Sequence, residues 1–141
     1  MTRPAHAVVD VSVAAKWLFG EPGTAHALAW KKQSLKEGIV LCAPEYLLVE
    51  LHNIVWKKIQ FAEMSATDPI LQFSPNFGLD LNWLPTLPLL PSALNRAIAL
   101  KIAVYDAIYV ALSLALGASF CTADQALAHR LKGFSVPVDL I

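Results

Sequence analysis

Short apolar runs alternate with longer segments of helical periodicity along the chain, and this alternation limits the fold more than any other feature. The predicted strands are 7–9, 39–42, 83–84, 119–121 and 136–138. The predicted helices are 12–19, 24–36, 44–61, 92–101, 106–116 and 123–131, with a shorter helix beginning near 65–67. Strands that alternate with helices form a parallel sheet covered on both faces. We therefore expect an α/β fold, a three-layer sandwich with a central, mainly parallel sheet flanked by helices, in a single domain spanning 1–141.

Two of these segments carry finer expectations. The helix at 24–36 is expected to bury one face, made of Ala25, Leu28, Ala29 and Leu35. Gly38 is expected to end this helix as a C-terminal cap. Pro137 favours an edge position for the last strand, because proline cannot donate a ladder hydrogen bond.

The composition is apolar and electrically balanced. Hydrophobic residues make up 56% and charged residues 16%, and the net charge is zero. A chain this apolar is expected to bury surface against a second copy of itself or a partner. The zero net charge means that any contact with a polyanion must come from local patches. Cys42 and Cys121 end short apolar runs and are expected to be buried, reduced thiols, which suits the cytoplasm.

One segment raises the question of a membrane. The stretch 102–121 is almost wholly apolar, but Asp106 lies within it and Gly117 interrupts it. A central Asp disfavours insertion by about 3 kcal/mol, so a buried helix followed by a strand explains the segment better. Asp10 interrupts the first apolar run, so no secretory signal peptide is expected.

Four acidic residues stand inside or beside apolar stretches, where an ionised side chain is costly: Asp10, Glu50, Asp106 and Asp124. Two of them follow predicted strands, and two begin or line helices that would pack over the sheet. In open α/β folds the functional site lies beyond the carboxyl ends of the strands. The four carboxylates could therefore face one pocket.

Three of the acids have a purely structural alternative. Asp10 could cap the helix that follows it, and Asp106 could favour its helix as a first-turn acid. Thr122 and Gln125 match a Thr-x-x-Gln capping box, which would make Thr122 the N-cap and place Asp124 in the first turn.

Glu50 is harder to explain structurally. Its neighbours one helical turn away are apolar except for Asn53. The alternative is a glutamate at the rim of the core, hydrogen-bonded to Asn53. Ser12, two residues after Asp10, could hold that acid or a water molecule.

Together the four acids predict a cation. Two carboxylates about 5 Å apart repel by roughly 3 kcal/mol at an effective dielectric near 20. Oxygen ligands without His or Cys favour Mg²⁺ or Mn²⁺ over Zn²⁺. His52 and His129 lack metal-type spacing. Several basic residues could grip phosphate, although a solvated face is the commoner explanation for each: Lys16, Lys57, Lys58, Arg96, Lys101 and Arg130.

Four sequence blocks, in order along nearly the whole chain, resemble the motifs of PIN-domain nucleases. They are Val9-Asp10-Val11-Ser12, Pro44 to Asn53 with Glu50 as its acid, Tyr105 to Leu112, and Thr122 to Leu127. The compact form is similar to the VapC toxins of toxin–antitoxin pairs. Residues 73–91 match no motif.

The resemblance implies an Mg²⁺- or Mn²⁺-dependent endoribonuclease, dimeric and silenced by a small VapB-like antitoxin. The implied catalytic and metal-binding residues are Asp10, Glu50, Asp106 and Asp124. Ser12 and Thr122 would orient an acid or a water, and Asn53 would steady Glu50.

Two other classes of protein compete with this reading. One is a catalytically idle PIN-like interaction subunit that keeps the fold and the acids. The other is a phosphoacceptor receiver domain, which requires paired acids at the first strand and a lysine at the last. His6 precedes Asp10 by four residues and 136–138 contains no lysine, which disfavours a receiver domain.

Overall fold

The computed structural model describes residues 5–141, and its strands and helices follow the predicted alternation. The strands are β1 (His6–Val9), β2 (Val40–Pro44), β3 (Asn82–Leu84), β4 (Ser119–Thr122) and β5 (Val138–Leu140). The α-helices are α1 (Val11–Leu18), α2 (Thr24–Lys36), α3 (Tyr46–Gln60), α4 (Leu90–Leu100), α5 (Val104–Leu116) and α6 (Gln125–Arg130). Two 3-10 helices, η1 (Pro69–Phe73) and η2 (Leu87–Leu89), lie between α3 and α4.

The five strands form one sheet in the order β3-β2-β1-β4-β5, and every neighbouring pair is parallel. On β1, Val8 is in register with Cys42 of β2 and with Phe120 of β4. From β1 the chain continues to β2 on one side and later returns to β4 on the other. The strand order therefore reverses at the β1–β4 pair, where α/β folds open a crevice beyond the carboxyl ends of the strands.

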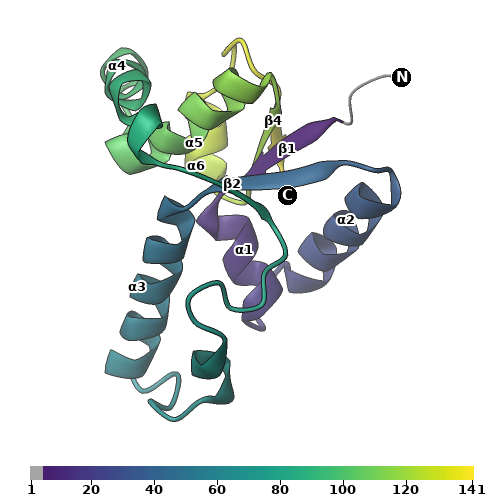
Figure 1. Ribbon diagram of the computed structural model, residues 1–141, viewed down its shortest axis with the longest axis vertical. Coiled ribbons are helices and arrows are strands. Elements are labelled where there is room, and N and C mark those ends of the chain that lie inside the picture. Colours follow the sequence, from purple (N-terminus) through teal and green to yellow (C-terminus); the bar gives the residue numbers. More distant parts are fainter. Residues whose placement is uncertain (1–4) are drawn as a thin grey trace.

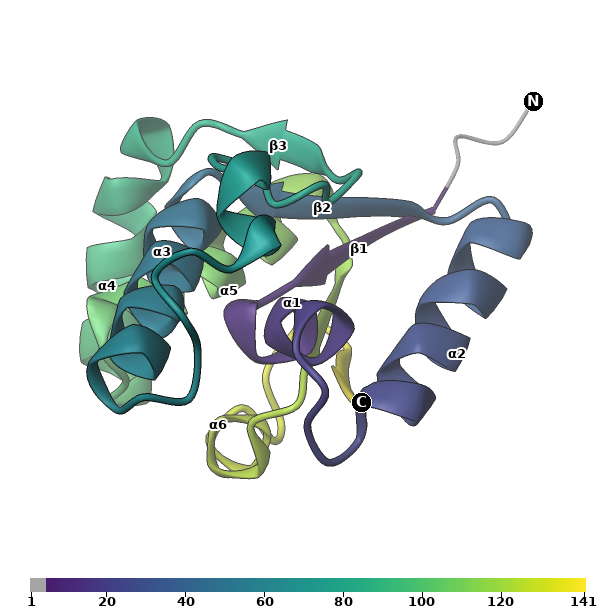
Figure 2. The same ribbon diagram turned by 90° about the horizontal axis from the view of Figure 1, so that it is seen from below.

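Helices cover both faces of the sheet. Helix α5 packs on β1, β2 and β4 and carries α4 on its outer side, whereas α1, α2 and α3 lie on the opposite face (Figure 1). Seen from below, α3, α4 and α5 gather on the side toward which β1 and β2 run, and α2 lies at the other end (Figure 2). The predicted three-layer α/β architecture is confirmed.

The core lies between these layers and is made of the predicted apolar runs. Val8, Val9 and Phe120 are buried, as expected for strands covered on both faces. Full burial of each such side chain stabilises the fold by about 1.5–3 kcal/mol. Both cysteines, Cys42 and Cys121, are buried free thiols, as predicted.

The predicted buried face of α2 is wrong. The four expected residues are all exposed: Ala25, Leu28, Ala29 and Leu35. The helix instead buries Ala27 and Ser34. The Trp17 indole of α1 donates a hydrogen bond to the Ala27 carbonyl at 3.1 Å and stacks on Trp30 with 6.5 Å between ring centroids. These contacts turn the side of α2 that carries Ala27 and Trp30 toward α1.

Several boundaries differ from prediction by a few residues. Gly38 follows α2 with a positive φ of 78°, which agrees with its predicted capping role. Strand β5 begins two residues late, after Pro137, and lies at the sheet edge as expected. The short helix predicted near 65–67 is the 3-10 helix that begins at Pro69. Farther on, α4 begins at Leu90, before the predicted Ser92.

The apolar stretch 102–121 forms α5, the turn at Gly117 and β4, in agreement with the predicted buried helix followed by a strand. Within residues 5–141 no single helix is long and apolar enough to span a membrane. The segments Leu87–Leu100 and Val104–Leu116 meet the length and composition test only as a pair, which is bent by 112°.

Candidate functional site

Asp10 lies at the strand-order reversal, directly after β1. Its backbone N–H donates to the Cys121 carbonyl at 3.2 Å, which continues the β1–β4 pairing by one residue. Its carboxylate Oδ1 accepts from the backbone N–H of Ser12 at 3.0 Å and of Val13 at 3.3 Å. Asp10 is therefore the N-cap of α1, which is the structural role that the sequence allowed for it.

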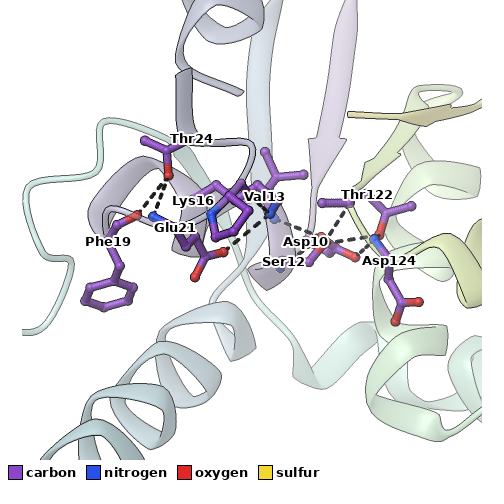
Figure 3. Close-up of polar contacts among 11 residues, drawn as sticks. Asp10, Ser12, Val13, Lys16, Phe19, Glu21, Thr24, Thr122 and Asp124 are labelled. Atoms are coloured by element: carbon purple, nitrogen blue, oxygen red, sulfur yellow. Dashed lines mark hydrogen bonds and ion pairs between the residues drawn. The ribbon is translucent and has the colours of Figure 1, made fainter. Parts of the chain in front are cut away.

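The cap bonds occupy only Oδ1 of the Asp10 carboxylate. Two hydroxyl groups donate further hydrogen bonds, one to each carboxylate oxygen. Thr122 donates to Oδ2 of Asp10 at 2.5 Å, and Ser12 donates from its side chain to Oδ1 at 2.5 Å (Figure 3). Ser12 in turn accepts from the backbone N–H of Ala123 at 2.8 Å. The first turn of α1 and the end of β4 thus hold one carboxylate from both sides.

Burial raises the pKa of the Asp10 carboxyl from 3.8 to about 6, although its hydrogen bonds to Ser12, Thr122 and Val13 lower it. The side chain is only 5% exposed. Ionisation of Asp10 at neutral pH therefore weakens the fold unless a positive charge comes to lie beside the carboxylate.

Glu50 projects from α3 and accepts a hydrogen bond from the Tyr109 hydroxyl of α5. The expected bond to Asn53 is wrong, because in the described part of the chain Glu50 pairs with Tyr109 and Asn53 is exposed. Tyr109 was not among the residues predicted to contribute to the site. The sequence feature that could have indicated its role is a tyrosine within the otherwise aliphatic run of α5, because a buried tyrosine hydroxyl needs a hydrogen-bond partner.

The pKa values link Glu50 to two other acids. Burial raises the pKa of Glu50 from 4.5 to about 7, and the charges of Asp10 and Asp106 raise it further, against the lowering effect of the Tyr109 hydrogen bond. Burial and the nearby Glu50 charge also raise the pKa of Tyr109 well above its ordinary value. Glu50, Asp10 and Asp106 therefore lie close enough for their charges to interact.

Asp106 is the third residue of α5 and is half-buried. Burial, followed by the charge of Asp124, raises the pKa of Asp106. Asp106 and Asp124 line one cavity of about 260 Å³. Lys101 and Arg130 line the same cavity.

Asp124 is the N-cap of α6 and accepts from the backbone N–H of Leu127 at 3.0 Å. The predicted Thr122–Gln125 capping box is therefore wrong. Thr122 is the last residue of β4, where it pairs with Leu140 of β5 and stays extended. Its hydroxyl accepts from the Asp124 backbone N–H at 3.0 Å and binds Asp10 instead of a helix end.

The ligand chemistry of the four acids suits a divalent cation better than the spacing of their side chains does. All four donors are carboxylates, the ligands that Mg²⁺ and Mn²⁺ prefer. The ion pairs found in residues 5–141 are Lys16–Glu21 and Lys58–Glu63, so neither involves these acids. Over the same range, however, no three of the His, Cys, Asp and Glu side chains are grouped closely enough to hold a metal ion.

The position of Glu50 explains in part why the acids are not grouped more closely. It faces a second cavity of roughly 500 Å³, distinct from the one lined by Asp106 and Asp124. Val11, Tyr46, Asn53 and Tyr105 are among the residues that line this cavity. Binding of one cation by all four acids would require the Glu50 and Asp106 side chains to approach each other.

Comparison with known proteins gives matches in structure alone. No protein-family model matches the chain, and no curated protein matches it in sequence. The crystal structure of PAE2754 from Pyrobaculum aerophilum is 22% identical with a TM-score of 0.64, over 96% of this chain and 84% of that one. FitAcB from Neisseria gonorrhoeae is 15% identical with a TM-score of 0.53, over 94% and 96% of the two chains. At these identities the likeness concerns the fold alone, and it agrees with the predicted α/β fold with a parallel sheet flanked by helices.

Proposed function

We propose that this protein is a divalent-metal-dependent endoribonuclease that hydrolyses RNA phosphodiester bonds. The observation that carries the proposal is a set of four carboxylates at the carboxyl edge of the sheet, with interacting charges and no ion-pair partner in residues 5–141. The four are Asp10, Glu50, Asp106 and Asp124. The pKa values of three of them, Asp10, Glu50 and Asp106, are raised, which is typical of acids at a functional site.

The protein would contribute positioned ligands. Ser12 and Thr122 hold both oxygens of Asp10, and Tyr109 holds Glu50. Such contacts orient a carboxylate before a cation arrives. A bound Mg²⁺ or Mn²⁺ would polarise the phosphate and lower the pKa of the attacking water.

Cleavage of a labelled RNA with Mn²⁺ tests the proposal. We expect Asp10→Asn and Asp106→Asn to lose more than about 100-fold in rate, since changes outside the ligand set already lower activity by about 10–100-fold. Asp80→Asn is the matched control, because this substitution makes the same change in charge at an exposed residue of the loop before β3. Equal rates for wild type and Asp10→Asn would refute the assignment.

A catalytically idle PIN-like interaction subunit is the second candidate, and one observation favours it. The acids do not form a three-ligand group in the described residues. Calorimetric titration with Mn²⁺ separates the two functions. A nuclease is expected to bind at micromolar to millimolar concentrations and to lose that heat in Asp10→Asn, whereas an idle subunit would give no heat in either protein.

We further propose that the nuclease is the toxin of a VapBC-type pair, with a small antitoxin and a homodimeric state. The resemblance of its motifs to those of VapC toxins supports the toxin role. Exposed apolar side chains support an antitoxin or a second copy as a partner, among them Val49, Trp56, Leu94 and Ile98. Expression of the chain alone is expected to arrest growth, and co-expression of the neighbouring gene to relieve it. Analytical ultracentrifugation of the purified chain would test the dimer. Unimpaired growth with active nuclease present would refute the toxin role.

A further inference from the structure

The cavity beside Asp106 and Asp124 also contains two basic residues. Lys101 follows the last residue of α4, and Arg130 is the last residue of α6. Both line the same cavity of about 260 Å³ as the two acids. From the sequence, each of these cations is either solvated or phosphate-binding, and the structure places both of them beside two of the site acids, whereas Lys57 lines the Glu50 cavity.

Arg130 is fixed by a contact that leaves most of its donors available. Its Nη1 donates to the Lys101 carbonyl at 2.9 Å and ties α6 to the turn between α4 and α5. A guanidinium has five N–H donors in a planar fork, so this bond occupies one of them. The bond holds the charge beside the cavity at a reduced entropic cost for binding an anion.

Lys101 has a backbone conformation that its side chain does not favour. Its φ is 56° and its ψ is 44°, in the left-handed region where Gly or Asn usually ends a helix. In residues 5–141 only two other non-glycine residues have a positive φ, Ala62 and Phe77. Residues in sparsely populated backbone conformations cluster at functional sites. A glycine would fit this turn better but would remove the charge.

Neither Lys101 nor Arg130 forms a close ion pair with Asp106 or Asp124. Both ion pairs in residues 5–141 lie elsewhere, at Lys16–Glu21 and Lys58–Glu63. A cavity with two carboxylates and two cations that do not pair suits a ligand that brings charges of both signs. A phosphodiester strand that approaches a cation held by the acids has this character, and the carboxylates alone would repel it.

We propose that Lys101 and Arg130 bind the phosphate backbone of the substrate strand on the Asp106–Asp124 side of the site. The inference rests on the proposed nuclease function and adds a subsite to it. A phosphate contact contributes to binding without reading sequence, and its strength falls as salt rises because counterions are released. Both properties can be measured without metal and without cleavage.

The test is the affinity of a fluorescein-labelled single-stranded RNA for the full chain in EDTA, measured by anisotropy over a range of salt. Lys101→Gly is the informative variant. It should raise the melting temperature by relieving the left-handed strain. It should also weaken RNA binding about two- to fivefold at low salt and flatten the salt slope by about 0.7. A variant that is more stable and binds less cannot owe its loss to misfolding.

A second variant and a control complete the comparison. Arg130→Gln should weaken binding in the same way, because it removes the other proposed phosphate contact. Lys36→Gln makes the same change in charge in the last turn of α2, at the opposite end of the strands, and should bind like wild type. A loss of equal size in Lys36→Gln would overturn the proposal, since the effect would then be one of net charge.

DNA of the same sequence forms the second arm of the experiment. A contact to phosphate predicts equal relative losses for RNA and DNA. A loss confined to RNA would place the contact on the ribose and overturn the proposal. Unchanged binding in both Lys101→Gly and Arg130→Gln would overturn it as well. Because no metal is present, a binding loss in these variants supports the subsite even if wild type does not cleave with Mn²⁺, a result that would refute the nuclease function alone.

Discussion

Raising the pH from acid to neutral should weaken the fold through Asp10. Burial raises the pKa of this carboxyl from 3.8 to about 6 in the folded chain. A carboxyl whose folded pKa is raised contributes stability at low pH and loses it as pH rises through the folded pKa. The full loss is about 1.36 kcal/mol for each unit of pKa difference, hence about 3 kcal/mol in total. About 2 kcal/mol of this loss falls between about pH 4.5 and pH 7.5.

The Asp10→Asn variant isolates this contribution, because Asn cannot ionise and can still accept the cap bonds from Ser12 and Val13. Urea unfolding of both proteins across this pH range, without divalent metal, gives the free energy of unfolding at each pH. We expect the difference between wild type and variant to change by about 2 kcal/mol, in favour of the variant as pH rises. The pKa of Glu50 is also raised, in part by the charge of Asp10, so the difference between the two proteins includes the coupling of Glu50 to Asp10.

A pH-independent difference between the two proteins would refute the reasoning, because the buried Asp10 would then ionise as easily in the folded chain as in the unfolded one. A difference of the opposite sign would show that the hydrogen bonds from Ser12 and Thr122 outweigh burial.

Three further predictions concern the same site. Tyr109→Phe should raise the pKa of Glu50 above about 7, because the hydroxyl that lowers it is gone; a carboxyl-carbon NMR titration that gives a lower pKa would contradict this. Asp124→Ala should lose about 0.5–2 kcal/mol of unfolding free energy with the α6 cap, and Asp124→Asn should lose less; equal stability of all three proteins in urea would remove the cap assignment. At neutral pH, Mn²⁺ at 100 times its dissociation constant should stabilise wild type by about 2.7 kcal/mol in thermal unfolding, and an equal gain in Asp10→Asn would place the metal elsewhere.

The sequence predicts the sheet well because the signals are local. Strands β1, β2 and β4 lie on short apolar runs, and Asp10 follows β1 directly, so both its place at the strand end and its cap follow from neighbouring residues. The same reasoning expected Ser12 to hold Asp10, and the two side chains are hydrogen-bonded.

Features that depend on distant contacts were missed. The partner of Glu50 is Tyr109, 59 residues away, and no spacing rule connects them. The length of β4 depends on its pairing with β5, which keeps Thr122 in the strand and moves the cap to Asp124. The buried face of α2 depends on Trp17 of another helix, because α2 carries small or apolar residues on more than one side.

The hydrogen bond between Tyr109 and Glu50 has a consequence for how remote substitutions act. Asp106 and Tyr109 lie about 4.5 Å apart along the axis of α5, so one rigid helix carries one acid and holds another. Ala93, Ala97, Ala107 and Ala111 pack α4 against this helix with small side chains. Larger residues in that seam would displace α5 and change the spacing of Glu50 and Asp106. Ligand affinity would then respond to packing changes that touch no ligand.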